Sequence, residues 1–129
     1  MSLALDFFLC ETIEFNDLKL PNSESAYIAK EKVDGYLLSA KHPIGGAKSR
    51  WFNQIGYSLD NSELLRENLQ AFAKHDVNHK ETNEYGTKYV IIGDLKGPTG
   101  ESRLLATVWI ILNDDSVPRL VTALSLIHI

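Results

Sequence analysis

Apolar residues in the first half of the chain recur at helical spacing in three places: residues 31–38, 45–55 and 60–75. In the second place, Ala47, Trp51 and Ile55 are four positions apart, which predicts an apolar stripe along a helix. Gly56 follows, and glycine is typical of a helix end because it accepts a left-handed backbone. The pattern therefore predicts short helices separated by turns.

The third helix has the most regular spacing. Leu65, Leu69 and Phe72 lie on one helical face, and we expect the helix to end near residue 74 or 75. Residues 60–63, Asp-Asn-Ser-Glu, supply candidate N-caps for this helix, and Asp60 with Glu63 has the spacing of a capping box.

From residue 87 onward the pattern changes to runs rich in β-branched residues. Three strands are predicted, at residues 89–92, 104–112 and 120–127. Turn residues separate the last two at positions 113–116 and the first two at positions 97–100, which favours an antiparallel meander. The middle strand is apolar on both faces, so both must be covered. We expect the second and third helices on one face, and either the N-terminal arm or a second copy of the chain on the other.

This order of elements predicts an α+β fold, in which two to three N-terminal helices pack on a three- to four-stranded antiparallel β-meander. Residues 1–25 are predicted to form an N-terminal arm, and residues 26–129 a single domain.

Charge and cysteine content narrow the possible environments. The net charge of −4 resides in residues 1–34, because residues 35–129 carry ten acidic and ten basic side chains. This balance argues against a protein that coats nucleic acid but leaves room for a local cationic cleft. Cys10 is the single cysteine, so no intramolecular disulfide forms, which fits a cytoplasmic protein. No apolar run is long enough to span a bilayer, and we expect no membrane partner.

The densest group of candidate functional side chains lies in residues 41–50, at the start of the second predicted helix. His42 precedes a Gly-Gly turn, and Lys48 and Arg50 follow it. Such an arrangement suits a phosphate site with a proton-transferring group beside it. The alternative is a loop histidine next to a solvated basic face.

His75 and His79 are four positions apart and would share a helical face. They are candidates for acid–base chemistry. A metal site would need a third ligand, and the sequence provides none at a suitable spacing, so we expect no metal and no cofactor. The alternative is a polar helix end, which histidine suits.

Three polar residues interrupt the apolar strands: Thr107, Arg119 and Thr122. In a regular strand, Arg119 and Thr122 would point to opposite faces, while Thr107 would share a face with Leu105 and Trp109. Threonine is also simply a good strand former, so a structural role is the alternative. The sequence contains no P-loop, dinucleotide-binding, zinc-protease or serine-hydrolase motif.

Several short motifs occur together in a fixed order: His42-Pro-x-Gly-Gly-Ala-Lys48, Lys88-Tyr-Val-Ile-x-Gly-Asp-Leu-x-Gly-Pro98, Thr107-Val-Trp109 and Pro118-Arg-Leu-Val-Thr-Ala123. Over residues 26–123 the chain resembles a family of small bacterial domains of unknown function. The layout of helices before an antiparallel sheet also resembles, more distantly, the metal-independent ribonuclease superfold of barnase-like, EndoU-like, colicin-type and RelE-type proteins.

The ribonuclease resemblance implies cleavage of RNA by its own 2′-hydroxyl, which needs a base, an acid and a cation near the phosphate. His42, Lys48, His75, Arg119 and Thr122 are the residues that would supply these roles. The chain departs from the pattern after Ala123, where Leu124-Ser125 replaces an aromatic-proline pair. The alternative function is a non-enzymatic interaction module, including an immunity- or antitoxin-type partner. The expected partners are therefore RNA, a cognate immunity or antitoxin protein, or a second copy of the chain.

Overall fold

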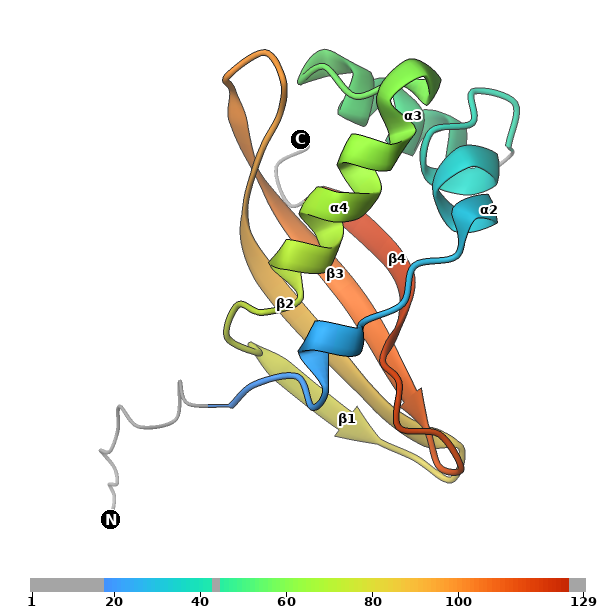
Figure 1. The fold of residues 1–129 in the computed structure, drawn as a ribbon, viewed down its shortest axis with the longest axis vertical. Coiled ribbons are helices and arrows are strands. Elements are labelled where there is room, and N and C mark those ends of the chain that lie inside the picture. Colours follow the sequence, from blue (N-terminus) through green and yellow to red (C-terminus); the bar gives the residue numbers. More distant parts are fainter. Residues whose placement is uncertain (1–17, 43–44, 126–129) are drawn as a thin grey trace.

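The computed structural model describes residues 18–42 and 45–125, arranged as helices packed on one face of an antiparallel sheet (Figure 1). The elements follow in the order η2 (Ser23–Ser25), α2 (Lys30–Lys32), η3 (Val33–Leu37), α3 (Gly45–Gln54), η4 (Leu59–Asn61), α4 (Ser62–Phe72), β1 (His79–Thr82), β2 (Gly86–Lys96), β3 (Ser102–Leu112) and β4 (Arg119–Ser125). The predicted α+β fold is confirmed.

Helix α4 packs its predicted apolar face into the core. Leu65 and Leu69 are fully buried and Phe72 nearly so, and α4 lies diagonally in front of the sheet in Figure 1. Helix α3 ends close to the predicted position, and Gly56 has a φ of 105°. Of the predicted stripe, Ile55 is fully buried and Trp51 packs against the core, whereas Ala47 is exposed. Phe52, beside the stripe, is buried as well.

The predicted capping box at the start of α4 is wrong. The box forms two residues earlier, where Asp60 N–H donates to Ser58 Oγ and Ser58 N–H donates to Asn61 Oδ1. A 3₁₀ turn, η4, therefore precedes α4, and the side-chain cap lies at the start of this turn rather than at Asp60.

The four strands form a meander in the order β1-β2-β3-β4, with every neighbouring pair antiparallel. Three of these strands are predicted by the sequence, and β1 is not. The predicted end of the last strand, residues 126–127, lies outside the described residues, as do residues 1–17 of the predicted arm. The arm therefore stays a prediction, although Leu20 is already part of the core.

Strand β3 alternates between the two faces of the sheet. Leu105, Thr107 and Trp109 face the helices and are buried, which confirms that these three share a face. The alternate residues of β3 lie on the opposite face of the sheet, on which none of the described helices packs, and we call it the open face. There Ile92, Ala106 and Leu124 form a row across three strands, and Ile92 and Leu124 remain 36% and 42% exposed.

The outer edge of β4 has a partner from the start of the chain. Tyr27 N–H donates to Pro118 O over 2.8 Å, and Leu120 N–H donates to Tyr27 O over 3.0 Å. This pairing makes a single parallel bridge between Tyr27 and Arg119. The segment that leads into α2 is therefore anchored on the last strand.

Candidate functional site

A π-turn positions one tyrosine at the edge of the sheet. The helix that begins at Lys30 widens at Val33, where Leu38 N–H donates to Val33 O over 2.8 Å, five residues back. Single π-turns inside helices are frequent at functional sites. Here the widened turn contains Tyr36, whose hydroxyl lies 3.1 Å from Thr122 Oγ1 on β4.

Two of the predicted functional residues join this tyrosine. The His42 ring packs edge-on against the Tyr36 ring, with 4.9 Å between ring centroids. Lys48, from α3, donates a 3.0 Å hydrogen bond from Nζ to Ala123 O, next to Thr122. We call Tyr36, His42, Lys48 and Thr122 the Tyr36 cluster. All four are partly exposed, so their polar groups can reach solvent or a ligand.

A β-bulge changes where the side chains of β4 point. Arg119 is opposite Ile110 and Thr122 is opposite Val108, with a register shift between Val108 and Trp109. One extra residue on β4 accounts for the shift, so Arg119 and Thr122 fall on the same open face. The expectation of opposite faces, which assumed a regular strand, is therefore wrong.

Arg119 lies on that face but is engaged elsewhere. Its Nε is 3.2 Å from Asp115 Oδ2, and its guanidinium lies 5.1 Å from the centre of the Tyr27 ring. Hydrogen bonds from the backbone N–H groups of Val117 and Ser116, and then Arg119, hold the pKa of Asp115 below its usual value. The ion pair is solvent-exposed, and such pairs are weak, so a phosphate can compete for the guanidinium.

His75 lies apart from the Tyr36 cluster. Its ring is 4.9 Å from that of Phe72, and it sits over Gly93 of β2. Strands β2 and β4 are separated by β3, which places His75 about 10 Å across the sheet from β4. The structure thus brings His42, Lys48 and Thr122 together and leaves His75 outside.

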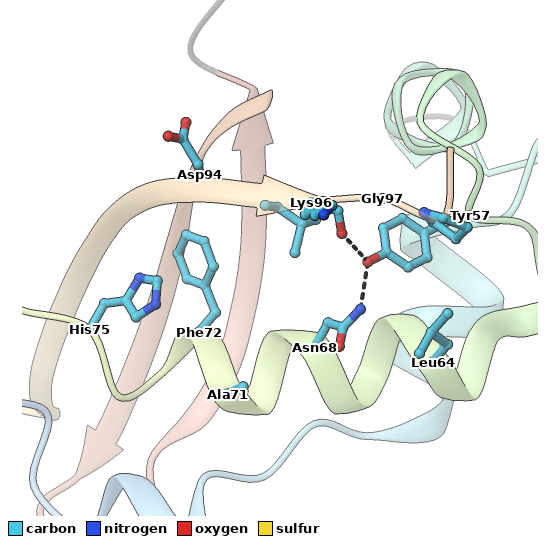
Figure 2. A pocket seen from close by; sticks show the side chains of 11 residues that line it. Tyr57, Leu64, Asn68, Ala71, Phe72, His75, Asp94, Lys96 and Gly97 are labelled. Atoms are coloured by element: carbon cyan, nitrogen blue, oxygen red, sulfur yellow. Dashed lines mark hydrogen bonds between the residues drawn. The ribbon is translucent and has the colours of Figure 1, made fainter. Parts of the chain in front are cut away.

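His75 instead lines a pocket of about 400 Å³ between α4 and the end of β2 (Figure 2). At the far side of this pocket, the Tyr57 hydroxyl donates to Lys96 O over 2.8 Å and accepts from Asn68 Nδ2 over 2.6 Å. Burial raises the pKa of Tyr57. These bonds use the tyrosine to hold α4 against β2, which is a structural role.

Within residues 18–42 and 45–125, no three His, Cys, Asp or Glu side chains group closely enough to hold a metal ion. In the same part of the chain, no helix has the length and apolar character needed to cross a membrane.

Comparison with known proteins places the chain among relatives. Residues 19–126 match the family described as a domain of unknown function, DUF6883. The chain belongs to this family. A search of curated proteins gives no match.

The fold of this DUF6883 domain is also found among solved structures. One of these is a chain from a contact-dependent growth inhibition toxin–immunity protein complex of Klebsiella pneumoniae 342. The TM-score is 0.61 at 17% sequence identity, covering 75% of the present chain and 96% of the other. At this identity the similarity establishes the fold only.

Tyr36 is the member of the Tyr36 cluster that the sequence analysis misses. Its position suits the apolar side of a short helix, and nothing in its spacing shows that its hydroxyl meets Thr122, 86 residues later. Only the pairing of β4 with its neighbours and the π-turn bring the two together.

Proposed function

We propose that this domain is a metal-independent ribonuclease that cleaves RNA through attack by the substrate's 2′-hydroxyl, and that it acts as the toxin of a toxin–immunity pair in the cytoplasm. The observation that carries the proposal is the convergence of a histidine, a lysine and two hydroxyl groups from three separate segments. Such a reaction needs a proton acceptor, a proton donor and stabilisation of the phosphorane charge, and these side chains can supply all three.

In this proposal His42 transfers the proton, because an imidazole can both accept and donate near neutral pH. Its edge-on contact with the Tyr36 ring fixes the position of the imidazole. Lys48 stabilises the negative charge on the phosphate, and its bond to Ala123 O holds the ammonium beside β4. Thr122, paired with the Tyr36 hydroxyl, orients the phosphate by hydrogen bonding.

Arg119 has a secondary place in the proposal. It shares the open face with Thr122 but lies beyond the bulge, so it would bind a neighbouring phosphate of the same strand. His75 has no assigned step because β3 separates its strand from β4.

The likeness to a chain of a toxin–immunity complex supports a place in such a pair, as toxin or as immunity protein, and with it a cognate protein partner, since the fold is shared along most of both chains. It carries no information about the reaction. The assignment of chemistry rests on the Tyr36 cluster.

An RNA-cleavage assay with and without EDTA tests the reaction. We expect the wild-type domain to cleave RNA in EDTA, and to leave an all-deoxy substrate intact because that substrate lacks the attacking hydroxyl. His42→Ala should lose at least about 100-fold in rate, the usual contribution of a general acid–base group. His79→Ala, a change at an exposed histidine on β1, is the matched control and should retain activity. Cleavage that needs a metal, or full activity in His42→Ala, contradicts the mechanism.

The phosphate-binding role has its own matched pair. Lys48→Ala should slow cleavage, whereas Lys74→Ala removes an exposed lysine beyond the end of α4 and should not. Equal rates for the two variants would remove Lys48 from the site.

A second candidate function is a protein-interaction module, either as a homodimer or with an immunity- or antitoxin-type partner. The exposed apolar residues of the open face favour it: Ile92, Leu112 and Leu124. Light scattering across a concentration series tests the homodimer, with Ile92→Asp as the disrupting change. If the wild-type domain has the molar mass of a monomer at every concentration, the same as the variant, the result counts against self-association.

A further inference from the structure

A second pocket, of about 420 Å³, adjoins the Tyr36 cluster. It opens between α3, the start of β3 and the end of β4. Its described walls are mainly apolar: Trp51, Phe52, Leu105 and Leu124. Lys48 also lines it. The pocket therefore combines an apolar wall with one cation that belongs to the proposed catalytic cluster.

Trp51 is the largest side chain in this pocket and is held in place. It is partly buried against the core, and its ring meets that of Phe52 edge-on, with centroids 4.9 Å apart and planes at 88°. A fixed, partly exposed indole beside a polar site is a good stacking surface for a flat ring. Proteins commonly bind unpaired bases of single-stranded RNA on such aromatic side chains.

Lys48 ties the pocket to the phosphate position. Its ammonium is fixed at Ala123 O, and Ala123 also lines the pocket. A ligand with an apolar ring in the pocket and a negative charge at its mouth would satisfy both features. A nucleotide has this chemistry.

We propose that this pocket holds one nucleobase of the RNA substrate, stacked on Trp51, with the adjoining phosphate at Lys48. The inference rests on the proposed ribonuclease function and adds a base-binding subsite to it. Stacking accepts every base, so the subsite fixes the position of the strand rather than its sequence.

Tryptophan fluorescence tests the subsite directly. The chain has two tryptophans, and Trp109 is fully buried, so a ligand in the pocket affects the emission of Trp51. Each of the four ribonucleoside 3′-monophosphates should quench emission saturably, and ribose 5-phosphate, which has no base, should not. Trp51→Phe should abolish the quenching, and Lys48→Ala should weaken nucleotide binding but not nucleoside binding.

A second variant guards against misfolding of Trp51→Phe. Ala47→Glu changes an exposed residue that lines the pocket and places a negative charge there, so it should abolish quenching while the fold is retained. Asn53→Glu, at another exposed position of α3 outside the described lining, is the matched control and should bind normally. Normal quenching in folded Ala47→Glu overturns the assignment.

Cleavage kinetics separate the subsite from the reaction. Trp51→Phe should raise KM for RNA about tenfold with little change in kcat. Quenching in a protein that never cleaves RNA supports the pocket and refutes the ribonuclease proposal. If nucleotides do not quench the wild-type domain and Trp51→Phe cleaves RNA with an unchanged KM, the pocket assignment is refuted and the ribonuclease proposal is not. A pocket reserved for an apolar side chain of a protein partner gives no nucleotide-dependent quenching in the intact domain, and that result also overturns the assignment.

Discussion

The Thr107 hydroxyl links the indole of Trp109 to the backbone of β2. Trp109 Nε1–H donates to Thr107 Oγ1 over 2.8 Å, and the same hydroxyl donates to Ile91 O over 3.3 Å. Both side chains are 0% exposed, so water cannot replace either bond. The change Thr107→Val keeps the shape of the side chain and leaves the indole N–H unpaired in the core.

Leaving one buried donor unpaired costs about 1–3 kcal/mol. We therefore expect Thr107→Val to lower the free energy of unfolding by about 2 kcal/mol, or Tm by roughly 6–10 °C for a domain of this size. Urea unfolding followed by circular dichroism measures the loss as a lower midpoint with an unchanged slope. If the proposed ribonuclease activity holds, the folded variant should cleave RNA as the wild type does, because Thr107 faces the core.

Two comparisons isolate the cause. In a Trp109→Phe background no indole N–H exists, so Thr107→Val should cost much less there, and the double-mutant cycle gives the coupling directly. Thr122→Val changes a partly exposed threonine and should cost less than about 1 kcal/mol, since its partner hydroxyl can turn to water. An equal loss for Thr107→Val in both backgrounds refutes the explanation.

Three further predictions concern the frame of the domain. A Cβ at Gly97 would lie 2.0 Å from the backbone carbonyl oxygen of Ile55, just after α3, whereas a Cβ at Gly35 would meet no atom within 4 Å. Urea unfolding should therefore show that Gly97→Ala is strongly destabilised. Gly35→Ala should be as stable as the wild type or more stable by up to about 1 kcal/mol. Ser58→Ala should cost about 0.5–2 kcal/mol by the same measurement and Asp60→Ala much less; the reverse order would restore the cap at Asp60. Because burial raises the pKa of Tyr57 in the folded state, its contribution is complete below the unfolded value of about 10 and is lost as pH rises through the folded value. Unfolding free energies measured on both sides of about pH 10 should therefore fall more steeply for wild type than for Tyr57→Phe, and parallel curves would contradict the assignment.

The sequence predicts those helices and strands in which buried apolar side chains recur at the regular spacing of a helix or a strand. Strand β3 and helix α4 are recognisable because each buries one regular set of apolar side chains. Strand β1 is not, because all four of its residues are exposed and only pairing with β2 makes it extended. A polar edge strand has no periodic signal of its own.

The candidate site was predictable only in its residue types. His42 and Lys48 stand out because they cluster with Arg50 at a predicted helix start, and Thr122 because it interrupts an apolar strand. Their convergence depends on a π-turn and a β-bulge, and neither has a marker in the sequence. Val121, the extra residue of β4, is an ordinary strand residue, so the one-residue shift that turns Thr122 to the open face is invisible before the register is known.

The short pairing of Tyr27 with β4 has a consequence for assembly. A bare sheet edge is a template on which another chain can add a strand, and natural proteins block it with covering segments or with short, charged edge strands. Here Tyr27 occupies part of one edge, and at the other β1 is short and carries Lys80 and Glu81. Polymerisation through backbone pairing is thereby discouraged at both sides. A protein partner of this domain would then have to recognise its side chains, on the open face or over the Tyr36 cluster, rather than extend its sheet.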